Sequence, residues 1–129
     1  MSRPTLGAIS PFFIVGDVDC TIAFYRDRLG FAVTFKDPET LPFFAIVLRD
    51  GAQLFFKSSA GVPPVPNVMR HPSLRWDAYI HTSDPDGLAA ELLRRGAEFS
   101  SPLQDTADGL RGFEIIDPVG LVLFFGRPG

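Results

Sequence analysis

Three side chains that could carry acid–base chemistry or bind a metal stand at alternate positions of one expected strand. This strand covers residues 76–82, and its period of two places Asp77, Tyr79 and His81 on the same face. The other histidine, His71, lies in a proline-rich segment, and the two histidines lack the i, i+4 or His-x-His spacing typical of a metal site. A lone histidine on a strand more often packs or forms hydrogen bonds, so both roles stay open for His81.

Nucleophilic catalysis has weaker support. The single cysteine, Cys20, falls at the start of an expected helix, where a thiol can be acidified. No base is expected beside it, so we interpret Cys20 as a packed residue. A single cysteine also excludes an intrachain disulfide.

Composition limits the kind of partner that the chain can have. The formal net charge is −3 and no block of Lys or Arg occurs, which argues against nucleic acid. The first residues lack the apolar run of a secretion signal, and no stretch approaches the roughly 20 apolar residues of a membrane helix. These features predict a cytoplasmic globular protein with no membrane partner. The 13 phenylalanines indicate a dense core or an apolar cavity.

The elements that must position these side chains occur twice. The segment 15–19 matches 82–86 at an offset of 67 residues, and the glycine-led segment 51–56 matches 120–125 at an offset of 69. Gly30 and Gly96, which end the two expected helices, are 66 residues apart. Three landmarks in the same order at nearly constant displacement indicate an internal repeat.

Each repeat is expected to be a βαβββ module, and the two together predict an α+β class. In the first, the helix caps at Asp17; in the second, it caps at Ser83 or Asp84. Module one covers about 8–58, module two about 76–127, and a linker of about 59–75 joins them within one domain of 1–129. The expected strands are 9–15, 31–36, 43–49 and 52–57, then 76–82, 97–101, 111–116 and 121–126.

Two strings resemble the glyoxalase/bleomycin-resistance/dioxygenase superfamily, also called vicinal oxygen chelate proteins. Residues 15–31, Val-Gly-Asp-Val-Asp-Cys-Thr-Ile-Ala-Phe-Tyr-Arg-Asp-Arg-Leu-Gly-Phe, resemble its first strand-to-helix passage. Residues 111–120, Arg-Gly-Phe-Glu-Ile-Ile-Asp-Pro-Val-Gly, resemble its turn into the last strand. The resemblance covers about 9–127. It implies tandem modules whose mixed sheets curl around a cavity, commonly completed in a homodimer.

The same resemblance argues against a metal. The positions that hold ligands in metal-dependent members fall on Ser10, Phe55, Asp77 and Phe124. Phenyl rings offer no lone pair to a divalent ion, and of these four residues only Asp77 is a plausible ligand. We therefore expect neither a metal nor another cofactor.

The implied cavity has a mostly apolar lining. Because side chains alternate along a strand, Phe12 shares the cavity side with Ser10, and Phe55 shares it with Gln53 and Lys57. Such a lining with a few polar groups is typical of a small-molecule pocket. Alternatively, phenylalanines fill the space, with Phe55 and Phe124 packed on each other. The expected ligand-binding residues are Ser10, Phe12, Phe55, Asp77, Tyr79, His81, Arg111 and Phe124.

Three functions remain open at this point. The first is a metal-free protein that binds an apolar or aromatic molecule without converting it, as the bleomycin-resistance members do. The second is a lyase, isomerase or dioxygenase of the same superfamily that uses Asp77, Tyr79 or His81 in a divergent site. The third is a structural dimerisation module that has no pocket.

Overall fold

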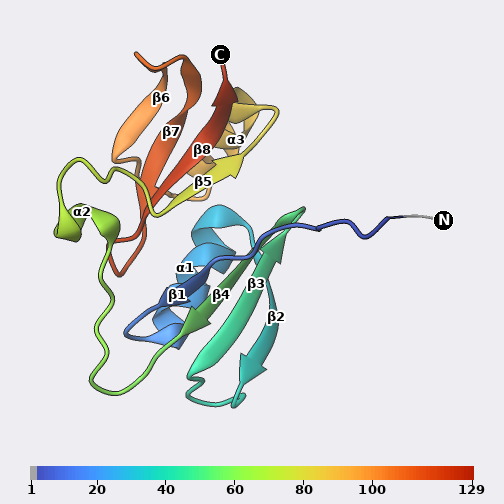
Figure 1. Cartoon of the computed structure of the whole chain (residues 1–129), viewed down its shortest axis with the longest axis vertical. Coiled ribbons are helices and arrows are strands. Elements are labelled where there is room, and N and C mark those ends of the chain that lie inside the picture. The colour runs from blue at the N-terminus through green and yellow to red at the C-terminus, as the bar shows by residue number, and fades with distance from the viewer. Residues whose placement is uncertain (1–2) are drawn as a thin grey trace.

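The computed structural model describes residues 3–129, which form two modules of like construction (Figure 1). In each module a strand and a helix precede three further strands, and the linker between the modules carries a short helix. Module one comprises β1 (Phe12–Ile14), α1 (Val18–Leu29), β2 (Ala32–Asp37), β3 (Phe44–Arg49) and β4 (Ala52–Lys57); module two comprises β5 (Ala78–His81), α3 (Pro85–Arg94), β6 (Ser101–Asp105), β7 (Leu110–Ile116) and β8 (Val122–Pro128); the linker helix is α2 (Asn67–Arg70).

The two sheets have the same topology. Their strand orders are β1-β4-β3-β2 and β5-β8-β7-β6, and the first strand of each module lies parallel to the last while the other pairs are antiparallel. The predicted α+β class and the tandem βαβββ plan are confirmed. Some local expectations differ. Helix α2 was not expected, and β1 and β5 are shorter than the expected 9–15 and 76–82. The strand expected at 97–101 is β6, whose pairing with β7 begins only at Ser101.

Short polar side chains and a glycine set the helix ends. The Asp17 carboxylate accepts a 3.0 Å hydrogen bond from the backbone N–H of Cys20, and Asp84 accepts one of 3.0 Å from Gly87. The alternative between Ser83 and Asp84 is thereby settled for Asp84. Gly30 ends α1 at a φ of 75°, a left-handed conformation that glycine adopts without a Cβ clash.

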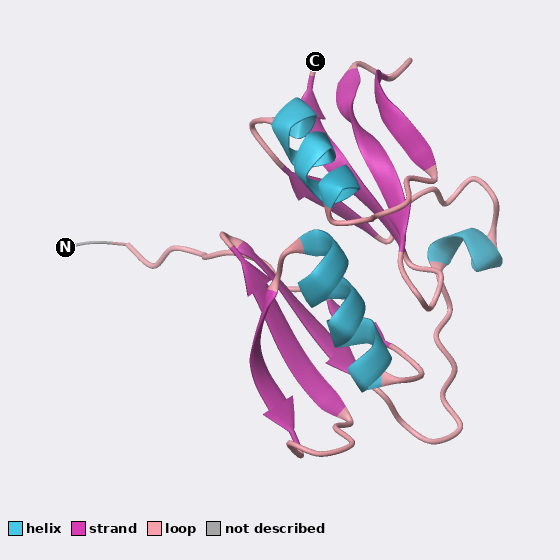
Figure 2. Cartoon of the chain, turned by 180° about the vertical axis from the view of Figure 1, so that it is seen from behind, coloured by secondary structure: helices cyan, strands magenta, loops and turns pink. Residues whose placement is uncertain are grey.

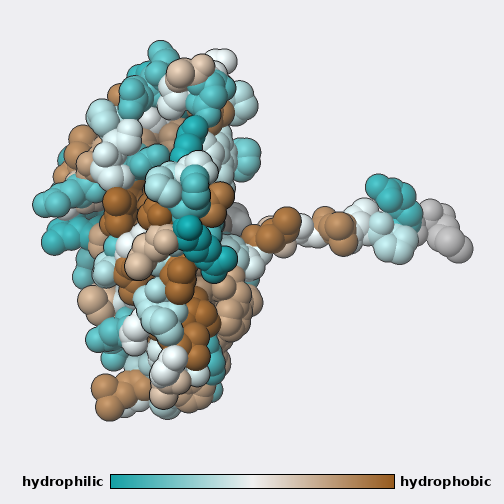
Figure 3. All heavy atoms as spheres, turned by 60° about the vertical axis from the view of Figure 1, so that its left-hand side comes forward, coloured by the Kyte–Doolittle hydropathy of each residue, from teal (hydrophilic) through white to brown (hydrophobic). Residues whose placement is uncertain are grey.

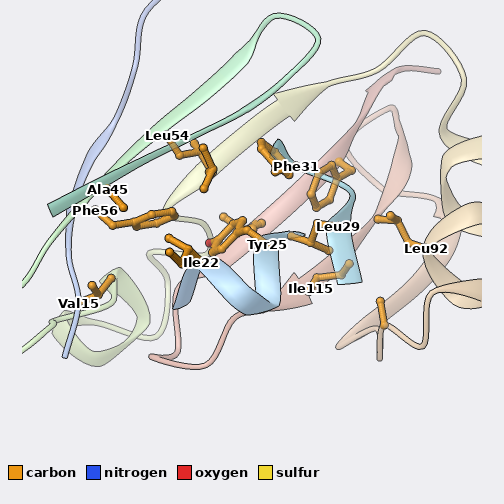
Figure 4. Packing of buried hydrophobic residues seen from close by; sticks show 14 of the residues in the cluster. Val15, Ile22, Tyr25, Leu29, Phe31, Ala45, Leu54, Phe56, Leu92 and Ile115 are labelled. Carbon is orange, nitrogen blue, oxygen red and sulfur yellow. The ribbon is translucent and has the colours of Figure 1, made fainter. Parts of the chain in front are cut away.

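Both long helices pack on the same side of the molecule (Figure 2). Figure 1 therefore looks onto the opposite face of each sheet, which we call the helix-free face. Between helices and sheets lies one continuous core whose side chains come from both modules (Figure 4). Tyr25 and Phe56 of module one and Leu92 and Phe113 of module two are each fully buried. Among the described residues, no helix combines the length and apolar character that a bilayer span requires.

Polar contacts join the modules at matching places. The hydroxyl of Tyr25 on α1 donates to the buried carboxylate of Asp117, in the turn after β7. At the end of β3, the Arg49 guanidinium donates to both carboxylate oxygens of Glu91 on α3, at 2.9 and 2.8 Å. In each module, a side chain at the end of the third strand, Arg49 or Asp117, therefore forms a hydrogen bond with the long helix of the other module. These charge-assisted bonds hold the two modules in their relative position.

These contacts shift the pKa values of the groups involved. Hydrogen bonds from Arg49 and then Arg95 lower the pKa of Glu91 to about 2. Burial raises the pKa of Asp117, although its hydrogen bonds oppose the shift. Burial, followed by the nearby Asp117 charge, raises the pKa of Tyr25 well above its usual range.

Candidate ligand-binding site

Four aromatic rings lie next to one another on the helix-free face of module two. Trp76 lies 4.5 Å from Phe124, centroid to centroid, at an interplanar angle of 27°. Phe124 lies 5.4 Å from Tyr79, and Tyr79 lies 4.6 Å from His81. We call Trp76, Phe124, Tyr79 and His81 the ring row. Such centroid distances are those of favourable aromatic pairs.

Two glycines allow the ring of Phe124 to lie flat on the sheet. Gly112 on β7 is the register partner of Gly126 on β8. A Cβ atom at Gly112 would lie 2.6 Å from Cζ of Phe124, and one at Gly126 would also overlap that ring. Phe124 is only 3% exposed, since the glycines lie below it and Trp76 stacks on it. It supports the ring row from beneath and contributes little surface of its own.

Module one carries a second aromatic group on its helix-free face. The rings of Phe12, Phe44 and Phe55 lie 5.9–6.2 Å apart, and Phe35 lies 6.0 Å from Phe44. We call these four residues the phenylalanine cluster. Phe55 therefore packs in this cluster and Phe124 in the ring row, so the alternative in which these two rings pack on each other does not hold. Phe12 is 57% exposed and Phe35 49%.

A groove of about 890 Å³ lies between the two modules. Its module-one side includes the end of α1, the segment before β1, the turn between β3 and β4, and the start of β4, where Gln53 and Leu54 lie. Its module-two side includes β5, α3 and part of β8, and here Tyr79 and His81 line it. One end of the ring row therefore opens into the groove, whereas Phe12, Phe55 and Phe124 are not part of its lining.

Asp77 lines the groove but is engaged in structural contacts. Its two carboxylate oxygens accept backbone hydrogen bonds of 2.8 Å, one from Asn67 on α2 and one from Val122 on β8. The backbone N–H of Asp77 donates in turn to the Val122 carbonyl. These bonds tie the linker helix to the sheet, and an oxygen that moved to a metal or a substrate would leave a backbone donor unpaired.

The residues at the family's ligand positions do not fit a metal. Phe55 and Phe124 have no donor atom, each oxygen of Asp77 accepts a backbone hydrogen bond, and the Ser10 hydroxyl accepts a 3.1 Å hydrogen bond from the Gln53 amide. Across residues 3–129, no three or more His, Cys, Asp or Glu side chains form a group that could hold an ion. Ser10 reaches the groove only through Gln53.

Arg111 differs from expectation. Its side chain lies on the helix side of the sheet, with the parity of the buried Phe113. There it donates two hydrogen bonds to Asp86 at the start of α3, at 2.7 and 2.8 Å, and one of 3.2 Å to Asp105. These bonds raise the pKa of Arg111, with those to Asp86 as the largest cause. The expectation that Arg111 faces the cavity is wrong, because a whole sheet lies between its side chain and the ring row.

The interpretation of Cys20 as a packed residue is also wrong. Its thiol is exposed in the first turn of α1. The buried face of that helix is formed by Val18, Ile22, Tyr25 and Leu29, and Cys20 points away from this line.

Two residues on the helix-free face were missed. In a strand that ran regularly from residue 76, Trp76 and Tyr79 would point to opposite faces of the sheet. However, β5 begins only at Ala78, and the indole of Trp76 lies over Phe124 on the face that Tyr79 occupies. Glu114 accepts a 3.0 Å hydrogen bond from the indole Nε1–H of Trp76. This position of Glu114 could have been predicted from the sequence, because it lies between Phe113 and Ile115, and strand alternation places it on the face opposite to theirs.

Comparisons with known proteins agree with this architecture. TioX from Micromonospora sp. ML1 has a TM-score of 0.73 at 21% identity over 95% of this chain and 100% of its own. A bleomycin-binding protein from Streptomyces verticillus, solved with copper(II)-bleomycin, has a TM-score of 0.67 at 27% identity over 99% and 100%. A glyoxalase-related enzyme from Clostridium phytofermentans has a TM-score of 0.73 at 14% identity over 98% of both chains.

No curated protein matches the chain in sequence. The family model of the glyoxalase/bleomycin resistance protein/dioxygenase superfamily matches residues 6–125, nearly the whole chain. The Asp17-capped helix, the turn at Asp117 and all strands except the end of β8 lie within this match. The chain therefore belongs to the glyoxalase/bleomycin resistance protein/dioxygenase superfamily.

Proposed function

We propose that this protein binds a small molecule with a flat aromatic or apolar part in the groove between its modules, without a metal and without converting it. One observation supports this above the others. The groove is large enough for a drug-sized molecule, and Tyr79 and His81 present ring surface at its wall. Gln53, on the opposite wall, supplies an amide that can orient a polar atom of the ligand.

The relative from Streptomyces verticillus supports a binding role, because it was solved with copper(II)-bleomycin and is 27% identical to this chain. The second candidate function is an enzyme that converts its ligand. Both oxygens of Asp77 already accept a backbone hydrogen bond, from Asn67 and from Val122, and these bonds favour the charged carboxylate over a proton-donating acid. Tyr79 and His81 are the remaining acid–base candidates in that wall.

We propose that two copies pair. The helix-free faces of both modules are open on the same side of the chain, and the phenylalanine cluster exposes large apolar rings there. A second copy that covered these rings would remove them from water. Light scattering should give twice the chain mass, and Phe35→Ser should shift the protein toward the monomer. A monomeric wild type would contradict the pairing and leave the groove proposal intact.

The binding proposal is tested by titration with a panel of planar aromatic compounds. Trp76 is the single tryptophan and neighbours Tyr79 at 5.5 Å, so its fluorescence should respond when the groove is filled. A compound at 100 times its dissociation constant should stabilise the fold by about 2.7 kcal/mol. Chelator treatment should leave binding unchanged, and the bound compound should be recovered unaltered.

Tyr79→Ala should weaken binding about fivefold, since ring contact of this kind contributes on the order of 1 kcal/mol. Phe43→Ala is the matched control, because that ring is 44% exposed on module one and is not part of the groove lining. The proposal fails if no compound in the panel stabilises the protein. Loss of binding on metal removal, or release of an altered compound, would favour the enzyme instead.

A further inference from the structure

The Trp76 end of the ring row carries a charge that the proposed function leaves unused. Glu114 lies on the helix-free face as the register partner of Phe124. Its oxygens accept hydrogen bonds from two neutral donors, the Trp76 indole at 3.0 Å and the Ser100 hydroxyl at 3.4 Å. Within residues 3–129, no Lys, Arg or His side chain forms an ion pair with it. The half-buried Glu114 carboxylate thus lies beside aromatic rings without an ion-pair partner among the described residues.

The indole beside Glu114 already holds a cation on its outer surface. The guanidinium carbon of Arg75 lies 4.4 Å from the centre of the Trp76 ring, while Phe124 stacks on the opposite side. A carboxylate that accepts from the indole N–H makes the ring richer in electrons, and this strengthens its attraction for a positive charge. Trp76, Phe124 and Glu114 therefore form a cation platform, a name we keep for these three residues.

Arg75 is held only loosely on this platform. Its other contact is a 3.2 Å ion pair with Asp108, and both side chains are about half exposed, at 52% and 49%. Exposed ion pairs of this kind are weak. A ligand with a better-placed positive group could therefore displace Arg75 at small cost. Figure 3 shows one face of the molecule, on which polar and apolar side chains lie next to each other.

We propose that the ligand is a planar organic cation, of the amidinium or guanidinium class, whose charged group replaces that of Arg75 over Trp76 with Glu114 as counter-charge. This rests on the proposed function and adds the charge of the ligand. Trp76 adjoins Tyr79 at 5.5 Å, so one molecule can lie against the groove wall and still reach the platform. The net charge of −3 favours a cation at longer range as well.

The test compares benzamidine with benzamide, which share shape and size but differ in charge. Both are titrated into ¹⁵N-labelled protein while the indole N–H resonance is followed; the chain gives one such signal because it has one tryptophan. Benzamidine should move this resonance and bind about tenfold more tightly than benzamide. In Glu114→Gln, whose amide oxygen can still accept from the indole, that preference should shrink to about twofold while benzamide binding stays the same.

Two further variants separate the platform from general cation binding. Arg75→Ala removes the internal competitor and should tighten benzamidine binding several-fold. Phe43→Leu is the matched control, since Lys57 lies 4.4 Å over that ring in module one, and it should have no effect. Equal binding of benzamidine and benzamide, or an unchanged preference in Glu114→Gln, would overturn the cation assignment and leave the binding proposal standing. If neither probe nor any neutral arene binds, both proposals fail.

Discussion

The hydroxyl of Tyr25 in module one donates a 2.7 Å hydrogen bond to the carboxylate of Asp117 in module two. Asp117 also accepts from the backbone N–H groups of Val119 and Leu121, so the turn before β8 is closed by the same carboxylate that holds α1. The pair is buried, and an unmatched polar atom at such a place is costly. The Asp-Pro-x-Gly turn that begins at Asp117 therefore holds the two modules together, and the groove keeps its shape only while they stay in this arrangement.

Tyr25→Phe should lower the free energy of unfolding by about 1–3 kcal/mol, because the Asp117 carboxylate loses a buried hydrogen-bond donor. Urea denaturation followed by circular dichroism measures the change. Tyr79→Phe is the matched control, since it removes a hydroxyl from the half-buried groove wall, and it should cost less than about 0.5 kcal/mol. Equal losses in the two variants would contradict the structural role of the Tyr25–Asp117 bond.

Glu91 should make the protein less stable in acid. Its pKa is lowered to about 2 in the folded state, so its contribution is complete above its usual value of 4.5 and is lost as the pH falls toward 2. Asp117 acts in the opposite direction, because its raised pKa makes stability fall as the pH rises through its folded value. Urea unfolding between about pH 7 and about pH 2.5 should give a flatter curve for Glu91→Gln than for the wild type. Parallel curves would show that the Arg49–Glu91 contact adds nothing.

Gly112→Ala should disturb the ring row. The added methyl group would overlap Phe124 and the backbone of Phe125, and such overpacking costs typically about 1–3 kcal/mol. Trp76 stacks on Phe124, so its emission maximum should shift with the displaced ring. Gly16→Ala is the control, because nothing lies within 4 Å of a Cβ atom there. An unchanged spectrum in Gly112→Ala would mean that Phe124 does not need the glycine floor.

Arg111→Gln should leave ligand binding unchanged. The side chain lies on the helix side, where it pairs with Asp86 and Asp105, both largely exposed. Exposed pairs contribute little, so the unfolding free energy should fall by less than about 1 kcal/mol. Titration with the best compound of the aromatic panel checks the first expectation and urea denaturation the second. A marked loss of affinity would contradict this expectation and indicate that Arg111 takes part in ligand binding.

The amino-acid sequence by itself determined the repeat, the helix ends at Asp17 and Gly30, and the helix-free orientation of Phe12 and Phe55. These features are local: a cap needs one side chain and one backbone N–H, and the face of a residue inside a regular strand follows from a period of two. The same rule, applied from the buried Phe113, would have placed Arg111 on the helix side and Glu114 on the other.

Only the tertiary structure decided what lines the groove. Trp76 joins the ring row because β5 begins two residues later than the pattern indicates, and the ring can then turn onto Phe124. The carboxylate of Asp77 accepts hydrogen bonds from Asn67 on α2 and Val122 on β8, which are 10 and 45 residues away in the sequence. The groove lies where two modules meet, and their relative placement depends on contacts such as Tyr25–Asp117, which span 92 residues. Local periodicity carries no information about such distances, since they are fixed only when the whole core packs.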